Sequence, residues 1–220
     1  MLLQNLIELV APADCLGCGR QGDPICRACL STPPVRAQRC YLCNIPVADG
    51  RTCPSCFEQA PLTAVTVATV YDGPVKELIL RLKFQRSRAA ATVAARVVLD
   101  RLPPDLGAEI VTAVPIAPAR YRERGYNQAE LVARAMARDL GLPYRSLLAR
   151  TSTTHQIGRS RHERFEAISG AFYPTRRLRG ERILIVDDVL TTGATLAECA
   201  RVLAVAGAGE VCGAAIARGA

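Results

Sequence analysis

The feature that most constrains the fold is a stretch near the carboxyl end of the chain. A short apolar run, residues 183–186, has the length and composition of a buried strand, and Asp187 and Asp188 follow directly at its end. After Val189 and Leu190, small residues lead into an Ala- and Leu-rich helix over residues 196–206. This order predicts a strand, a tight loop and a helix, the unit from which parallel α/β sheets are built.

The loop after the two acids has the chemistry of an anion site. Its residues are Thr191, Thr192, Gly193, Ala194 and Thr195. Such a loop offers close backbone approach, hydroxyl donors and the free amides of a helix start. A carboxylate repels phosphate, so we expect Asp187 and Asp188 to accept hydrogen bonds from sugar hydroxyls or to hold water around Mg²⁺. A ribose 5-phosphate carries both features. The alternative is that the acids only end a strand and the threonines only cap a helix.

Residues 183–195 also resemble, position by position, the signature of the type I phosphoribosyltransferases. That resemblance implies that Asp187 and Asp188 contact the ribose hydroxyls of phosphoribosyl pyrophosphate and that the following loop binds its 5-phosphate, with Mg²⁺ accompanying the ligand. It also implies an α/β fold with a doubly wound, mostly parallel sheet.

Eight of the ten cysteines form four Cys-x2-Cys pairs in the first quarter of the chain: Cys15, Cys18, Cys26, Cys29, Cys40, Cys43, Cys53 and Cys56. Each pair can place two sulfurs on one edge of a tetrahedron, so two pairs complete a structural zinc site. The spacing therefore predicts about two Zn²⁺ in a double zinc ribbon. Disulfides are the alternative, and they would suit a secreted chain. Sequential pairing needs the shorter loops, although crossed pairing remains open.

Length and charge set the domain plan and the ligand class. The 220 residues allow a small zinc-ribbon module with an N-terminal helix over residues 1–60 and a main domain over residues 61–220. The net charge is +8, and residues 117–182 hold 14 arginines against six acids, so we expect an anionic ligand there. Solvated helix faces are the plainer explanation. No run is long enough to span a membrane, and residues 1–10 lack a secretory pattern, so we expect a cytoplasmic protein.

The main domain alternates predicted strands and helices. Strands are expected over residues 65–70, 109–114 and 210–216, with helices after Pro74, over residues 89–102 and from Asn127 to Leu140. An arginine-rich loop is expected between the second strand and the third helix. In the phosphoribosyltransferases the loop after the first main strand binds pyrophosphate, which implies that role for Arg120, Arg122 and Arg124.

The sequence Arg-Glu-Arg-Gly-Tyr-Asn-Gln in that loop, the cysteine pairs before it and the signature after it together resemble the competence protein ComF family. Residues 150–172 are similar to the family's flexible active-site loop. The resemblance covers nearly the whole chain. It implies a role in DNA uptake during natural transformation, with single-stranded DNA and other DNA-uptake proteins as partners.

Three functions stay open at this point. The first is a phosphoribosyltransferase with an unknown acceptor, in which a nitrogen nucleophile attacks ribose C1 as pyrophosphate leaves. The second is a nucleic-acid-binding protein that phosphoribosyl pyrophosphate regulates without turnover. The third is a salvage enzyme for a free base, although we find no base-recognition motif.

Overall fold

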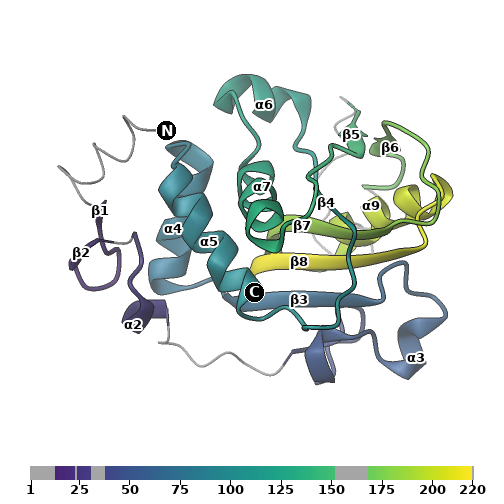
Figure 1. Ribbon diagram of the computed structural model, residues 1–220, viewed down its shortest axis with the longest axis horizontal. Coiled ribbons are helices and arrows are strands. Elements are labelled where there is room, and N and C mark those ends of the chain that lie inside the picture. The colour runs from purple at the N-terminus through teal and green to yellow at the C-terminus, as the bar shows by residue number, and fades with distance from the viewer. Residues whose placement is uncertain (1–12, 23, 31–37, 152–167, 220) are drawn as a thin grey trace.

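A four-stranded parallel sheet forms the centre of the molecule (Figure 1). The computed structural model describes residues 13–22, 24–30, 38–151 and 168–219. The strand order is β3 (Ala64–Val70), β8 (Glu210–Arg218), β7 (Arg182–Leu190) and β4 (Ile110–Ala113). All three pairings in this sheet are parallel, which confirms the expected sheet type.

Helices cover both faces of this sheet. On one face, called here the three-helix face, lie α4 (Gly73–Phe84), α5 (Arg88–Leu99) and α7 (Gln128–Leu140). The other face packs against α9 (Ala194–Val205) and is called the α9 face. Leu184 and Val186 belong to the first core, and Ile183 and Ile185 to the second. The apolar run is continuous because successive side chains enter two different cores.

The central strand β7 is longer than expected, and this corrects the predicted position of the two acids. Instead of ending at Val186, the strand continues through Asp187 and Asp188 to Leu190, paired with β8 along this length. On its other side, β4 ends earlier, after which Val114 N–H donates to the Val186 carbonyl over 2.9 Å. The carboxyl end of β7 therefore projects past β4, and the acids lie in this projecting part.

The predicted arginine-rich loop is mostly a helix, α6 (Pro118–Arg124). Pro118 occupies its first turn, and Gly125 ends it with a φ of +73°. Proline at a helix start and glycine at its end are the usual pattern, so the sequence held this signal. Asn127 then caps α7 as predicted, accepting from the Ala129 amide over 3.1 Å.

Beyond β4, the chain forms a small antiparallel pair, β5 (Leu148–Arg150) and β6 (Phe172–Pro174). Tyr144, just before β5, forms a parallel bridge with Val111 of β4. This bridge joins the segment before β5 to the β4 edge of the main sheet, whereas β5 and β6 form a separate two-stranded sheet.

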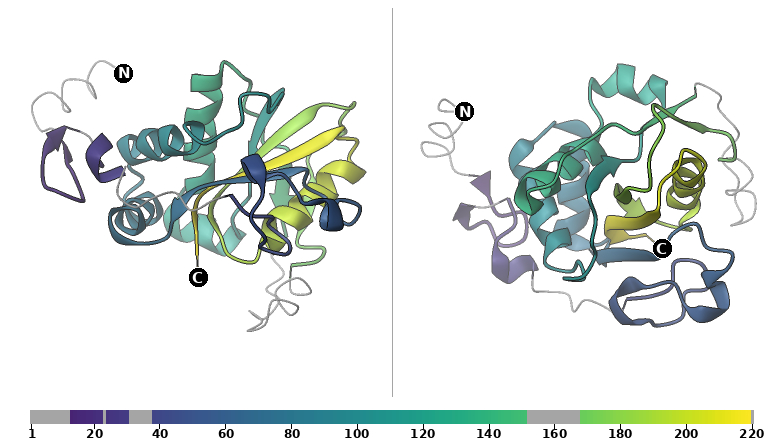
Figure 2. Two further views of the ribbon diagram at one scale, coloured as in Figure 1. Left: turned by 90° about the horizontal axis from the view of Figure 1, so that it is seen from below. Right: turned by 45° about the vertical axis from the view of Figure 1, so that its right-hand side comes forward.

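The two halves of the cysteine-rich segment lie at separate places on the main domain (Figures 1 and 2). The first half contains β1 (Ala13–Asp14), β2 (Gln21–Gly22) and α2 (Arg27–Leu30), which lies beside α4. The second half contains η1 (Ala48–Gly50) and α3 (Pro54–Phe57), and it lies against β3. There, the Gln38 side chain exchanges two hydrogen bonds with the Val67 backbone, at 3.0 and 3.1 Å.

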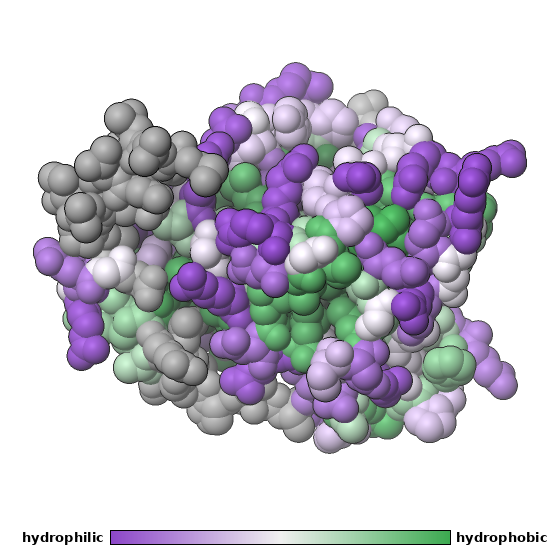
Figure 3. Space-filling view, viewed as in Figure 1, coloured by the Kyte–Doolittle hydropathy of each residue, from purple (hydrophilic) through white to green (hydrophobic). Residues whose placement is uncertain are grey.

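Polar and apolar residues are unevenly spread over the face in Figure 3. Hydrophilic residues cover its upper part, over α6, and an apolar region lies in the middle of this face. Among the helices that the structure describes, none has both the length and the apolar character needed to cross a membrane.

Candidate functional site

The loop between β7 and α9 presents the free first turn of a 12-residue helix. Gly193 begins the helix in the left-handed region, at φ +79°, where only glycine is unstrained. Thr192 Oγ1 accepts from the Ala194 amide over 3.4 Å. The next amides, of Thr195 and Leu196, have no intrahelical acceptor, as at every helix start. With the exposed Thr191 hydroxyl beside them, these groups can bind a phosphate.

Tyr41, from the second half of the cysteine-rich segment, packs against this loop. A Cβ atom added to Gly193 would lie 3.0 Å from Tyr41 Cδ2, so the ring lies directly on the loop backbone. Tyr41 is only 2% exposed, and its hydroxyl accepts from the Leu62 amide over 3.4 Å. A further contact nearby joins Arg218, at the end of β8, to Asn44 over 3.3 Å. The second cysteine half therefore supports the loop.

The two acids point to opposite faces of the sheet because strand side chains alternate. Asp188 follows the parity of Val186 and turns to the three-helix face, where it is 8% exposed. Asp187 follows the parity of Ile185 and turns to the α9 face, where its charge acts on buried Cys199. The expected pair is thus two carboxylates with different surroundings.

Asp188 is held by a polar network that joins three helices to β7. Its Oδ2 lies 3.0 Å from Lys83 Nζ of α4 and 3.2 Å from Gln128 Nε2 of α7. Gln128 Oε1 in turn accepts from Arg124 Nη1 of α6 over 3.1 Å. Lys83 and Gln128 both contact Oδ2, while Oδ1 accepts from the Val189 amide, so the network fixes Asp188 at the carboxyl end of the sheet.

The surroundings of Asp187 disfavour its ionised form. Burial, and then the negative charge of Asp188, hold the pKa of Asp187 well above its usual range. The Asp188 amide donates to Asp187 Oδ1 over 2.8 Å, which offsets part of the effect. Within the part of the chain that the structure describes, Asp187 has no ion pair. A bound cation or sugar hydroxyls would stabilise its ionised form.

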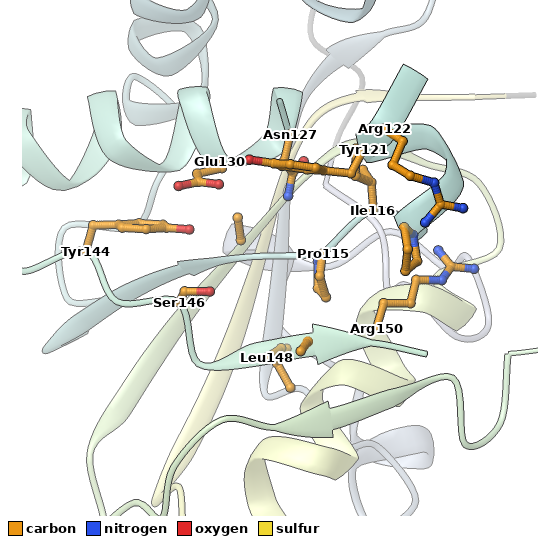
Figure 4. A pocket seen from close by; sticks show the side chains of 13 residues that line it. Pro115, Ile116, Tyr121, Arg122, Asn127, Glu130, Tyr144, Ser146, Leu148 and Arg150 are labelled. Carbon is orange, nitrogen blue, oxygen red and sulfur yellow. The ribbon is translucent and has the colours of Figure 1, made fainter. Parts of the chain in front are cut away.

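The structure separates the three arginines for which we expected one role. Arg124 turns toward the Asp188 network and stacks on the exposed ring of Phe84, 5.4 Å from its centroid. Arg122 lines a cavity on another side of α6, with Arg150 (Figure 4). Arg120 is exposed on the same helix.

Sequence reasoning did not single out Lys83, Gln128 or Tyr41 as site residues. In the sequence, Lys83 is one of several basic residues near the end of its helix, and Gln128 directly follows the first residue of another predicted helix, Asn127. Tyr41 carried no signal except its place inside a Cys-x2-Cys turn. The predicted flexible-loop stretch includes residues 152–167, which lie outside the described residues.

The eight paired cysteines form two four-cysteine clusters, which pair sequentially, as the shorter loops favoured. The first cluster is Cys15, Cys18, Cys26 and Cys29; the second is Cys40, Cys43, Cys53 and Cys56. Within each cluster the sulfurs lie within 4.8 Å of one another. Two Sγ distances, 3.7 Å for Cys18 to Cys26 and 3.5 Å for Cys43 to Cys53, are close to the separation of about 3.8 Å that a tetrahedral zinc–thiolate site requires. Both clusters could therefore hold a metal ion.

The pKa values of the clustered thiols are consistent with two metal-binding clusters. Burial raises the pKa of Cys15 and Cys40, but hydrogen bonds from backbone amides outweigh it and lower both to about 6. Side-chain hydrogen bonds with neighbouring cysteines raise the pKa of Cys29 and Cys56 to about 12. Four thiolates in one cluster therefore need a cation among them.

Comparison with known proteins agrees with this architecture. The phosphoribosyl transferase domain model matches residues 127–220. DNA utilization protein YhgH of Salmonella typhimurium is 30% identical over 199 residues, which cover 85% of this chain and 87% of that protein. Competence protein F of Haemophilus influenzae is 30% identical over 221 residues, covering 90% and 86%. Competence protein ComFC of Streptococcus pneumoniae is 27% identical over 192 residues, covering 87% and 80%. With its phosphoribosyltransferase-type sheet and two four-cysteine clusters, the chain belongs to the ComF family of competence proteins.

Proposed function

We propose that the protein binds phosphoribosyl pyrophosphate at the carboxyl end of β7. The observation that carries this proposal is the juxtaposition of two acids in the projecting part of β7 with the free first turn of α9. The 5-phosphate would bind the amides and hydroxyls from Thr191 to Thr195, and the ribose hydroxyls would bind Asp187 and Asp188. The raised pKa of Asp187 supports a hydroxyl or cation partner for that group.

The pyrophosphate of this ligand would lie on the side of β4 and α6. The cations there are Arg120, Arg122 and Arg124. Because these side chains face different ways, we infer that each contacts a different part of the pyrophosphate. Mg²⁺ would neutralise the charge of the pyrophosphate, and the carboxylates of Asp187 and Asp188 could hold it directly or through water.

We further propose that each four-cysteine cluster holds one structural Zn²⁺. Four sulfurs at near-tetrahedral separations leave no open coordination position, which is typical of a structural site. The second cluster would then also fix Tyr41 against the phosphate-binding loop.

If the protein turns over, a nitrogen nucleophile forms a bond to ribose C1 as the bond from C1 to pyrophosphate breaks. The two electrons of the broken bond leave with pyrophosphate, and the nucleophile loses a proton. Asp187 and Asp188 would orient the ribose and ease the positive charge at C1, while the arginines stabilise the leaving group.

The names of the relatives suggest a link to DNA uptake and use, and the excess of arginine in residues 117–182 is suited to a phosphate backbone. We therefore propose that single-stranded DNA is a second ligand. The second candidate function is a DNA-binding protein that phosphoribosyl pyrophosphate regulates without turnover. The exposed Arg120 and Arg122 of α6 favour it.

The test has two parts. Calorimetry with phosphoribosyl pyrophosphate should show binding that strengthens with Mg²⁺ and that ribose 5-phosphate competes for. A pyrophosphate-release assay with bases, ammonia and oligonucleotides then separates the two candidates. Release with any acceptor supports the transferase, whereas binding without release supports the regulated DNA-binding protein. Absence of binding at millimolar ligand contradicts both.

A further inference from the structure

A cavity of about 430 Å³ lies under α6, at the β4 edge of the sheet (Figure 4). Its volume is within the range of small-molecule sites, roughly 300–1,000 Å³. The apolar part of its lining comes from the end of β4, the turn after it and β5: Ala113, Pro115, Ile116, Leu148 and Ala149. None of the acids or threonines of the proposed ribose and phosphate site lines it, whereas Arg122, one of the three arginines proposed for the pyrophosphate, does.

Two aromatic rings line this cavity. In Figure 4 the rings of Tyr121 and Tyr144 both lie above the segment that carries Ser146 and Leu148. The Tyr144 ring is already covered by the Arg134 guanidinium, 4.2 Å from its centroid. Tyr121 is 51% exposed, and among the described residues no cation or ring contacts it. An open aromatic face above an apolar floor is suited to a planar ring.

Two guanidinium groups meet at one end of the same cavity. Figure 4 shows the heads of Arg122 and Arg150 turned toward one another. Neither has a carboxylate partner among the residues that the structure describes. Burial, and after it the charge of Arg120, lowers the pKa of Arg150, whereas Cys199 and Asp187 raise it. An anion between Arg122 and Arg150 would stabilise the charged form of both groups.

We propose that this cavity binds a nucleotide unit, with its phosphate between Arg122 and Arg150 and its base against Tyr121. The hydroxyls of Ser146 and Tyr144 and the carboxylate of Glu130 can bond to the polar edge of the base. A free nucleotide and one nucleotide of a single strand share this chemistry. Phosphoribosyl pyrophosphate carries no aromatic ring, so the base site is additional to the proposed binding of that ligand. For a nucleotide unit of a strand, the site rests on the proposed binding of single-stranded DNA and names the pocket for it.

The experiment compares three probes by calorimetry at low salt: deoxyadenosine 5′-monophosphate, a ten-residue oligodeoxyadenylate and inorganic pyrophosphate. Tyr121→Ala should weaken the two base-containing probes by about tenfold, in line with the loss of one stacked base. It should leave pyrophosphate unchanged. Arg122→Gln should weaken all three because each carries phosphate.

The matched control is Tyr173→Ala. Tyr173 is 49% exposed, nearly as much as Tyr121, but lies on β6 and does not line the cavity. Its replacement should change none of the three affinities. Phosphoribosyl pyrophosphate binding, measured beside them, should be the same in Tyr121→Ala and in the natural protein. The nucleotide proposal and the proposed function can thus fail separately.

Each outcome decides the proposal. The proposal is supported if the base-containing probes lose affinity in Tyr121→Ala and keep it in Tyr173→Ala. If the affinity for the monophosphate falls, free nucleotides are the ligand. If only the oligonucleotide responds, the ligand is a unit of a strand. If the base-containing probes bind with the same affinity as pyrophosphate, and Tyr121→Ala leaves that affinity unchanged, the base pocket is overturned. Failure of both base-containing probes to bind overturns it as well.

Discussion

Replacing one cysteine in each cluster tests how the clusters act on the phosphate-binding loop. Cys18 and Cys43 are both exposed, each is the second cysteine of its pair, and each supplies one sulfur to a cluster. Cys18→Ser disturbs the first cluster, beside α4. Cys43→Ser disturbs the second, whose turn carries Tyr41 onto Gly193. We expect only Cys43→Ser to weaken phosphoribosyl pyrophosphate binding.

The magnitude follows from the Tyr41 contact. If the second cluster opens, the ring no longer holds the loop, and at least two loop residues must be ordered again when the ligand binds. Ordering one residue costs about 1–2 kcal/mol, so binding should weaken by at least about 30-fold. Cys18→Ser should change the affinity by less than about twofold, since no contact of the first cluster with the loop is present among the described residues.

Calorimetry and metal analysis of the same samples provide the assay. Each variant should lose about one Zn²⁺ per chain. Tyr41→Ala should reproduce the affinity loss with both metals retained, and truncating a buried aromatic should also destabilise the fold by about 3–5 kcal/mol. Tyr41→Phe keeps the ring that contacts the loop and removes the hydroxyl that accepts from the Leu62 amide, so this variant should bind nearly normally. Equal affinities in Cys18→Ser and Cys43→Ser would refute the reasoning.

Three further predictions concern metal, the acids and DNA. Protein purified under reducing conditions should contain about two Zn²⁺ per chain by elemental analysis, and disulfides without zinc would contradict this. Asp188→Asn should lower the free energy of unfolding by about 1.5–3 kcal/mol because Lys83 loses its charged partner. Asp187→Asn should raise the free energy of unfolding. The folded protein holds the pKa of Asp187 above its unfolded value of about 3.9, so the natural protein loses stability, and the gain in the variant grows, as pH rises from about 4. Denaturant titrations at several pH values check both substitutions. Replacing the three arginines of α6 by glutamine should reduce the log–log salt slope of single-stranded DNA binding by about two units, at about 0.7 per phosphate contact, and an unchanged slope would place the strand elsewhere.

Local patterns predicted much of the fold. The apolar run before Asp187 and the capping residue Asn127 act through neighbouring residues, and the structure contains the corresponding strand and helix. The shorter loops favoured sequential pairing of the cysteines over crossed pairing, and the two clusters are sequential. The helix α6 was overlooked although Pro118 and Gly125 mark its ends, because the density of arginines suggested a loop.

Contacts between distant segments were not predictable. Nothing near Lys83 indicates that it pairs with Asp188, more than 100 residues later, since this depends on how α4 crosses the sheet. Tyr41 and Gly193 likewise meet only because the second cysteine half folds against β3. The opposite orientation of the two acids follows from the extension of β7, which the sequence did not signal.

The most direct test of the central claim is calorimetry of phosphoribosyl pyrophosphate with Mg²⁺ against the double variant Asp187→Asn, Asp188→Asn. The two replacements act oppositely on stability, so the double variant should remain folded. If the carboxylates hold the ribose, its affinity should fall by at least about tenfold, each lost charged hydrogen bond being worth about 1.5–3 kcal/mol. An affinity equal to that of the natural protein would contradict the ribose site at the end of β7.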